Sequence, residues 1–369
     1  MIIRIFGMPT DTGVGIHSRK IYESVKKIAD DRIRVDWLSK YESQGLADAI
    51  GSSTDEDINV FLFYSPGLTS LYKGTHLFWY AFESTIPMLG IEILNEEFHS
   101  IVSPSEWGRT CLINYGVAAD RIFVIPEGVD PWLYHPYPYS DRTSSTTKFL
   151  MVGKFETRKG YTEAIEAFSI AFEKNPNIEL LVKPDWVVGE KSRLSSSFIK
   201  LVLKHNHLPI KTVNSILTPN QMRDLYRSAD YFLFPSRCEG WGLPLIEAIA
   251  CGVPAICCDF GGQSEYLRSI PDGYLSIPYQ LDDIDCPKWK EDFPSKNGKW
   301  GQWAKIDIAN LAEMILKASQ TNFKEKALTA SDRIRREFSW DNAAEKLIKL
   351  ANELKNRKHH PIFSAHELT

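Results

Sequence analysis

The chain has 369 residues, of which 43% are hydrophobic and 24% are charged, and its formal net charge is -4. This composition is typical of a soluble globular protein, and the length predicts two domains that each bury a core. Acidic side chains outnumber basic ones over residues 1–135, which argues against a nucleic-acid groove there.

The start of the chain and its cysteines indicate the cellular compartment in which we expect the protein. Residues 1–6 begin a strand directly, so we expect no signal peptide, and no apolar run is long enough to span a bilayer. The six cysteines lack zinc-finger spacing and several stand in apolar surroundings, as in a reduced cytoplasmic protein. Basic residues within 19–27 could contact anionic lipid at the inner membrane face, or form a solvated helix face.

The first half alternates predicted strands and helices, which indicates a parallel sheet covered on both faces. Helices fall between the strands and include residues 16–28 and 104–115. The strands are expected at residues 2–6, 33–38, 58–64, 76–81, 98–102 and 122–126.

The loop before the first helix contains Gly13 and Gly15, followed by His17. Two glycines let the backbone approach a ligand closely, although a tight turn alone also explains them. Ser18 stands where the dinucleotide fingerprint requires glycine, so we do not expect a nicotinamide site. His17 could contact a donor or acceptor, or serve the structure of the loop.

Glu83 follows the strand predicted at residues 76–81. Ligands gather at the carboxyl ends of parallel strands, so Glu83 is a candidate for a reacting cleft. The alternative is an acid that stabilises the start of the next helix.

Residues 136–147 read as a linker, because prolines and aromatics give way there to small polar residues. A second series of strands and helices follows the linker, and residues 282–299 within it are expected to be polar and irregular.

The strands of this second series are expected at residues 149–152, 180–183, 212–217, 230–234 and 253–257. Its main helices are expected at residues 161–173, 218–227, 244–250, 307–319, 322–337 and 340–355.

The first loop of the second half carries Lys154, Arg158 and Lys159 between a strand and a helix. Cations at such a strand end can neutralise a diphosphate, and a solvated basic loop is the alternative.

The most informative stretch is residues 235–248, which predicts a strand end, a glycine-rich loop and a helix that begins near Pro244. A helix N-terminus offers unpaired N–H groups and a partial positive charge, which suits phosphate. Glu239 in the loop and Glu247 in the helix could hold neutral hydroxyls. Phosphate together with hydroxyls indicates a sugar nucleotide.

These features resemble the GT-B glycosyltransferases, specifically the retaining family-4 group, also called glycosyl transferases group 1. The resemblance rests on the Glu239/Glu247 pair within CEGWGLPLIEAIACGVPAI, and on GVGIH, VGKFETRKG, SPSEW, IPEGVD, SADYFLFPS and FSW. The first of these motifs is specific and the others are individually modest. Together they extend over residues 1–350.

The resemblance implies two Rossmann-like parallel-sheet domains facing each other across a cleft, with a C-terminal helix that crosses back to the first domain. The acceptor would approach the first domain and the donor would bind the second. The implied boundaries are residues 1–135 for the first domain, 136–147 for the linker, 148–338 for the donor domain, 339–357 for the last helix and 358–369 for a tail.

The resemblance also assigns roles. Glu239 would contact hydroxyls of the donor sugar, and Glu247 the ribose. Lys154 stands where relatives have arginine, and a lysine there neutralises phosphate without bidentate geometry. The catalytic candidates are Glu239, Lys154, Lys159 and Glu83, the last because FWYAFEST resembles a subgroup with glutamate at the usual histidine position. The donor contacts would be Gly13, Gly15, Lys154, Lys159, Leu217, Gly240, Trp241, Gly242, Leu243 and Glu247, with His17 and Glu83 in the acceptor cleft.

The implied reaction is retaining, metal-independent transfer of a sugar, typically a hexose, from a nucleotide-diphospho-sugar to a hydroxyl. The donor would be a UDP- or GDP-sugar, and the acceptor a glycan, a lipid-linked glycan or a small molecule, as in polysaccharide or lipopolysaccharide biosynthesis. We expect no cofactor, no metal and no nucleic-acid partner. Three alternatives remain: a sugar-nucleotide epimerase, a hydrolase, and a non-catalytic sugar-nucleotide-binding subunit.

Overall fold

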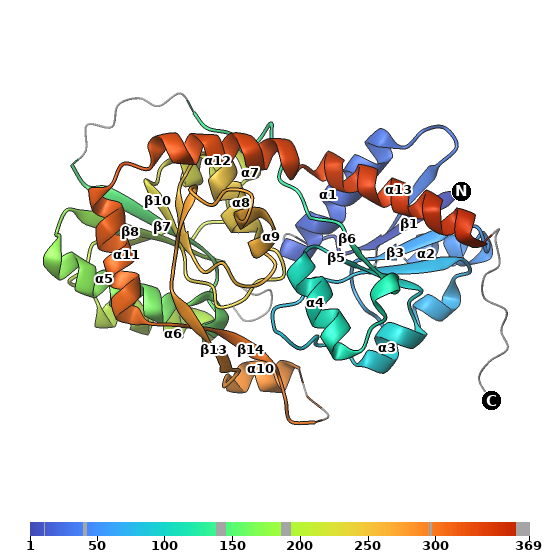
Figure 1. The fold of residues 1–369 in the computed structure, drawn as a ribbon, viewed down its shortest axis with the longest axis horizontal. Helices are drawn as coiled ribbons and strands as arrows, with labels where there is room; N and C mark the ends of the chain where they lie inside the picture. Colours follow the sequence, from blue (N-terminus) through green and yellow to red (C-terminus); the bar gives the residue numbers. More distant parts are fainter. Residues whose placement is uncertain are drawn as a thin grey trace. The chain divides into compact units, whose positions relative to one another are not determined.

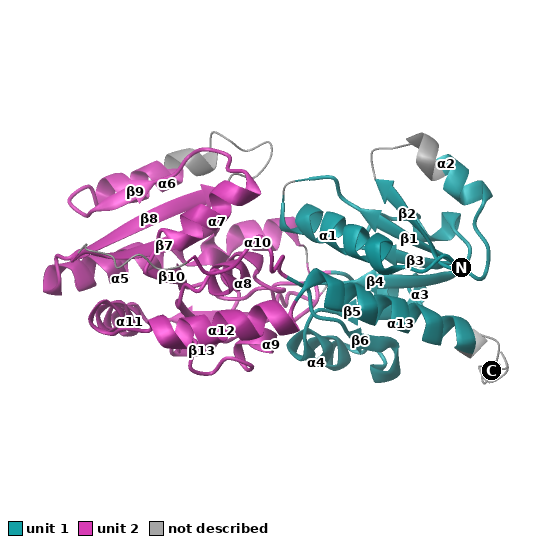
Figure 2. Cartoon of the chain, turned by 90° about the horizontal axis from the view of Figure 1, so that it is seen from above, with its two compact units in different colours: residues 1–81, 89–128, 339–369 teal, residues 82–88, 129–338 magenta. Residues whose placement is uncertain are grey.

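The computed structural model describes residues 1–10, 12–39, 43–137, 145–185, 193–293, 295 and 297–358. The chain forms two compact units, shown in different colours in Figure 2. Unit 1 comprises residues 1–81 and 89–128 together with the C-terminal residues from Ser339. Unit 2 comprises residues 129–338 together with residues 82–88, a short segment from the first half of the sequence.

Unit 1 is built on a six-stranded parallel sheet in the order β2-β1-β3-β4-β5-β6. The order reverses at β1, which pairs with both β2 and β3. The strands are β1 (Ile2–Gly7), β2 (Arg34–Ser39), β3 (Ile58–Phe61), β4 (Thr75–Trp79), β5 (Ser100–Ser103) and β6 (Ile122–Val124). The helices are α1 (Gly13–Ile28), α2 (Ser43–Gly51), α3 (Ile91–Glu96), α4 (Glu106–Tyr115) and α13 (Trp340–Lys358).

The last helix, α13, contributes to the core of unit 1. Ala344 and Leu347 are fully buried with Ile21 and Val25 of α1, against the apolar side chains of β1 and β3. This burial follows from the sequence of α13, because its apolar residues recur at helical spacing and form one stripe. The last helix, α13, is therefore part of the first Rossmann-like unit, although it begins more than 200 residues after the last strand of that unit's sheet.

Unit 2 repeats the architecture with the strand order β12-β11-β10-β7-β8-β9, again all parallel. The strands are β7 (Thr147–Lys154), β8 (Ile178–Asp185), β9 (Ile210–Thr212), β10 (Tyr231–Phe234), β11 (Ala255–Cys257) and β12 (Tyr274–Ser276). The helices are α5 (Tyr161–Lys174), α6 (Arg193–Lys204), α7 (Pro219–Arg227), α8 (Leu243–Ala250), α9 (Ser264–Leu267), α11 (Ile308–Gln320) and α12 (Lys324–Glu337), labelled where there is room in Figure 1.

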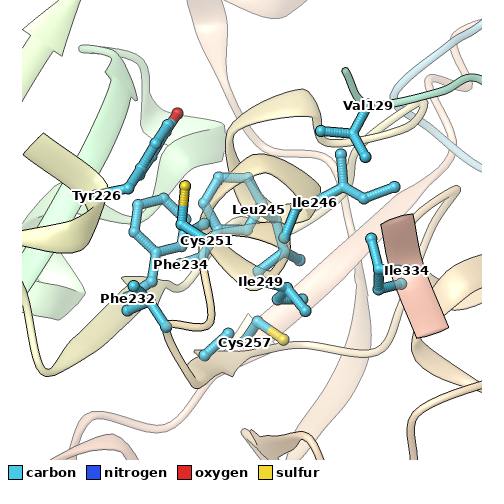
Figure 3. Close-up of a cluster of buried hydrophobic side chains, with 14 of the residues drawn as sticks. Val129, Tyr226, Phe232, Phe234, Leu245, Ile246, Ile249, Cys251, Cys257 and Ile334 are labelled. Carbon is cyan, nitrogen blue, oxygen red and sulfur yellow. The ribbon is translucent and has the colours of Figure 1, made fainter. Parts of the chain in front are cut away.

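Helix α8 is the centre of the unit 2 core. Leu245, Ile246 and Ile249 point into a cluster with Phe232 of β10 and Ile334 of α12 (Figure 3). Each of these five side chains is buried to 99% or more, so α8 is held on more than one face. The glycine-rich loop before α8 therefore starts from a rigid support.

The prediction of two parallel α/β sheets is confirmed, and the following local differences bear on the candidate site. Residues 282–299, expected to be irregular, contribute to an antiparallel hairpin of β13 (Tyr279–Asp283) and β14 (Gln302–Ile306), with α10 (Pro287–Asp292) between them. The strand expected at residues 212–217 ends at Thr212 as β9, so Leu217 lies in the following loop. Helix α1 begins at Gly13 and not at Ile16, which places both loop glycines inside its first turn.

Within the described part of the chain, no helix combines the length and the apolar character needed to cross a membrane.

Candidate active site

The sheet of unit 2 reverses its order between β7 and β10, which are hydrogen-bonded neighbours. In open α/β sheets, ligands bind beyond the carboxyl ends of the strands at such a switch point. The loops that leave these two ends are residues 155–160 and residues 235–242, the basic loop and the glycine-rich loop. The topology thus brings together two motifs that lie about 80 residues apart.

The glycine-rich loop is shaped by close backbone contacts. Gly262 donates its N–H to the carbonyl of Glu239 at 2.7 Å, and a Cβ on Gly262 would lie 1.8 Å from the carbonyl oxygen of Gly240. Gly242 has φ of +89° and precedes the first residue of α8, Leu243. Because only glycine adopts this conformation readily, Gly242 lets the chain turn into the helix, and its carbonyl accepts from the N–H groups of Leu245 and Ile246.

Glu239 is 5% exposed and is surrounded by donors. Lys159 Nζ donates to its Oε1 at 2.5 Å, Arg158 Nη1 lies 3.0 Å from the same oxygen, and the Ser236 hydroxyl donates to it as well. Burial raises the pKa of the Glu239 carboxyl, but the charges of Arg158 and Lys159 outweigh burial and lower it to about 2. Glu239 is therefore a buried carboxylate that stays ionised.

Arg158 contacts several carboxylates, although it is not among the site residues predicted from the sequence. Its Nη1 also donates to the carbonyl of Cys238 at 2.6 Å, and its Nη2 lies 3.3 Å from Glu156 and 3.5 Å from Glu83. Burial acts to lower the pKa of Arg158, but Glu239 and Glu83 raise it overall. The sequence marks Arg158 only as one of three cations in its loop.

Glu83 belongs to unit 2 through the segment of residues 82–88. Its side chain is 31% exposed, and it reaches Arg158 with Oε1. The structure thus brings together Glu83, Glu239 and Lys159 of the predicted catalytic set. The fourth member, Lys154, is the last residue of β7 and is half-buried.

Glu247 lies one turn into α8, where the hydroxyl of Tyr226 donates to its Oε2 at 2.8 Å. Burial and the Glu247 charge both raise the pKa of Tyr226, which is fully buried at the end of α7. Tyr134 is also beside Glu247, and burial raises its pKa too. Neither tyrosine is marked by the sequence motifs.

The remaining donor-contact candidates of unit 2 differ in what their side chains can do. Trp241 is buried against Tyr266 in the core, so only its backbone can face a ligand. The backbone of Gly240 packs closely against Gly262. Leu217 is half-buried in the loop that precedes the capping box of α7.

The glycine loop and His17 lie in unit 1. A Cβ on Gly15 would lie 1.9 Å from the carbonyl oxygen of Thr10, so packing alone requires glycine there. A Cβ on Gly13 would meet nothing within 4 Å. His17 lies inside α1, not in a loop, and its Nδ1 is 3.2 Å from Glu127 Oε1. A contact of Gly13 or His17 with substrate stays a prediction.

No group of three or more His, Cys, Asp or Glu residues within the described ranges lies close enough to hold a metal ion. The six cysteines are buried thiols without disulfides.

Comparisons with known proteins point to one family. Residues 140–285 match the family model of the glycosyl transferases group 1. Mannosylfructose-phosphate synthase of Agrobacterium fabrum is 26% identical over 189 residues, which are 48% of this chain and 41% of that protein. D-inositol 3-phosphate glycosyltransferase of Paenarthrobacter aurescens is 28% identical over 171 residues, 44% and 40% of the two chains. The chain thus spans about two fifths of the length of these curated relatives.

Solved structures extend the likeness to the whole fold. HepE of Anabaena in complex with UDP and glucose aligns with a TM-score of 0.68 and 14% identity, covering 96% of this chain and 100% of that one. Sucrose-phosphate synthase of Thermosynechococcus elongatus aligns with a TM-score of 0.68 and 16% identity, covering 97% and 100%. Residues 140–285 are thus similar to the group 1 glycosyl transferases, and the fold of the chain is GT-B.

Proposed function

We propose that this protein transfers a sugar from a nucleotide-diphospho-sugar to a hydroxyl of a glycan, a lipid-linked glycan or a small molecule, with retention and without a metal ion. The observation that carries the proposal is the ionised, buried Glu239 beside the N-terminus of α8. A carboxylate for sugar hydroxyls and amides for phosphate thus adjoin each other at one sheet edge.

Glu239 has one oxygen to offer a substrate. Its three protein donors, Lys159, Arg158 and Ser236, all meet Oε1. Among the described residues no donor is assigned to Oε2, so that oxygen can accept from a sugar hydroxyl. The cations hold the charge on the carboxylate, and the charged acceptor then makes a stronger hydrogen bond to the sugar than a neutral one would.

The donor diphosphate would lie against the first amides of α8, near Gly242 and Leu243, with Lys159 and Lys154 as its cations. An ammonium group has three donors, so Lys159 can bond Glu239 and a phosphate oxygen together. Glu247 would take the ribose hydroxyls, fixed in place by Tyr226. These groups together would stabilise the charge that develops on the leaving diphosphate.

The reaction that fits this arrangement is attack on the leaving-group face. The bond from the anomeric carbon to the diphosphate oxygen breaks, and a bond to the acceptor oxygen forms on the same side. The acceptor proton passes to the departing phosphate oxygen, so the step needs no protein base. Glu239 would orient the sugar and stabilise positive charge on its ring.

The relatives suggest where to look for the donor. HepE was crystallised with UDP and glucose, which favours a UDP-sugar here, with a GDP-sugar as the second choice. The test is a thermal-shift panel with UDP, GDP, ADP, CMP and TDP, because a ligand that binds only the folded state raises its midpoint. The sugar donors of the base that binds are then assayed for transfer, and NMR of the product gives its anomeric configuration.

Release of free sugar at the same rate with and without acceptor would indicate a hydrolase and contradict the proposal. Nucleotide binding with no turnover of any donor would indicate a binding subunit. An inverted product would refute retention alone.

A further inference from the structure

The strand β14 contacts both loops that carry the acids of the site. It forms the second half of the hairpin of residues 279–306, and its preceding residues, Trp300 and Gly301, continue the same edge. The backbone N–H of Gln302 meets residues 82–88, and the backbone N–H of Ala304 meets the glycine-rich loop at Arg237. Both contacts lie within unit 2.

Toward residues 82–88, the hairpin makes three hydrogen bonds to three consecutive residues. The Trp303 indole Nε1 donates to the carbonyl of Glu83 at 2.7 Å, and the N–H of Gln302 donates to the Thr85 hydroxyl at 2.8 Å. The Ser84 hydroxyl in turn donates to the carbonyl of Trp300 at 2.5 Å. These partners are 216 to 220 residues apart in the sequence.

Gly301 shows how closely the two segments approach. Its φ is +86°, and a Cβ there would lie 2.3 Å from the Ser84 hydroxyl oxygen and 2.7 Å from the N–H of Ile86. A side chain at this position would push the segment away, so the contact depends on glycine.

Toward the glycine-rich loop, the N–H of Ala304 donates to the carbonyl of Arg237 at 2.9 Å. The N–H of Arg237 donates to the carbonyl of Arg158 at 2.8 Å, and its side chain pairs with Glu163 of α5. Arg237 is two residues before Glu239. The same strand therefore fixes the backbone next to Glu239 and the backbone of Glu83.

The contact of Glu83 with Arg158 is not enough to position Glu83 by itself. The two groups are 3.5 Å apart, and the Glu83 side chain is 31% exposed. At that distance the charges attract each other without a short directional hydrogen bond, so the ion pair alone does not fix the orientation of Glu83. The hairpin adds this constraint because it holds the backbone of Glu83.

We propose that the hairpin of residues 279–306 is a positioning element that sets Glu83 against Arg158 and Glu239, with Trp303 as its principal positioning residue. This inference rests on the proposed function, because it assumes that Glu83 acts in sugar transfer. Trp303 does not contact the substrate in this proposal. It acts through the carbonyl of Glu83.

The test compares Trp303→Phe with Trp289→Phe. Trp303 is buried and Trp289 packs edge-on against it at 5.1 Å between ring centres, so both changes cost packing in one aromatic cluster. Only Trp303→Phe removes the donor to Glu83. We expect it to lower kcat roughly threefold to tenfold, the effect of one hydrogen bond, with the donor KM unchanged. Trp289→Phe should stay within about twofold of wild type.

The Glu83→Gln background separates a positioning role from general destabilisation. If Trp303 acts through Glu83, Trp303→Phe should cost almost nothing further in Glu83→Gln, within about twofold. Additive losses would overturn the proposal, as would equal losses for Trp303→Phe and Trp289→Phe in the wild-type background.

Hydrogen exchange of residues 82–88 measures how firmly the hairpin holds this segment, and it does not depend on sugar transfer. Exchange in this segment should be roughly threefold faster or more in Trp303→Phe than in Trp289→Phe. If wild type transfers no sugar, the proposed function fails, and a catalytic role for the hairpin fails with it. Exchange still shows whether the hairpin holds Glu83, so the two failures are distinguishable. Unchanged exchange would refute the positioning itself.

Discussion

Replacement of Glu239 by glutamine tests the electrostatics of the site most directly. The change keeps the size of the side chain and removes its charge, leaving Arg158 and Lys159 buried side by side. The pKa of Glu239 in the folded protein is about 2, against an ordinary value of 4.5. A difference of this size corresponds to about 3 kcal/mol of stability at neutral pH.

The sign of the pH dependence follows from the direction of the shift. A carboxyl whose folded pKa is lowered stabilises the protein above its unfolded pKa and loses that contribution as pH falls through the folded pKa. The window is therefore pH 4.5 down to about 2. The advantage of wild type over Glu239→Gln should therefore be clearly smaller at pH 3 than at pH 7.

The assay is urea unfolding of wild type and Glu239→Gln between pH 7 and pH 3 at constant salt, read as the difference in unfolding free energy. Glu313→Gln, an exposed change on α11, is the control and should show no trend. A wild-type advantage that does not change with pH would refute the reasoning. Glu239→Gln should also lower turnover by roughly 10²–10³-fold, as loss of a preorganised electrostatic group does.

Three further predictions concern the rest of the site. Tyr226→Phe removes the donor to Glu247 and should weaken UDP binding roughly threefold to tenfold by calorimetry; unchanged affinity would contradict the ribose assignment. Gly262→Ala places a Cβ 1.8 Å from the carbonyl oxygen of Gly240 and should lower stability by about 1–3 kcal/mol in urea unfolding, whereas a wild-type midpoint would show that the loop can shift. Transfer should persist in excess EDTA, and its complete loss, restored by a divalent ion, would refute metal independence.

The long strands and helices of both units could be predicted because their apolar residues form a continuous run or recur at helical spacing. Strands of three residues such as β12 lack that signal, because so short a run has no period. The hairpin escaped prediction for another reason. Strand β13 is mostly exposed, so its composition is that of a loop, and its pairing partner is supplied by β14.

Two residues of the candidate site, Glu239 and Lys159, could be selected from the sequence because each stands in a loop between a predicted strand and a predicted helix. Their roles in sugar transfer stay predictions. Arg158 is different, because the turn of residues 157–159 buries it next to Lys159, and no sequence pattern indicates that both face one carboxylate. Tyr226 meets Glu247 across 21 residues, and Glu83 meets the hairpin across about 220, so neither pairing leaves a local pattern.

The pairing of Arg158 with Glu239 bears on how Lys159 can serve both Glu239 and a substrate. If Lys159 serves the donor diphosphate as proposed, its attraction to Glu239 weakens when the phosphate arrives. A buried carboxylate that lost its only cation would take up a proton, because burial raises its pKa. Arg158 cannot lose its own proton under these conditions, so it keeps Glu239 charged while Lys159 is shared. The site therefore needs two cations on Glu239, one permanent and one that can turn to the substrate.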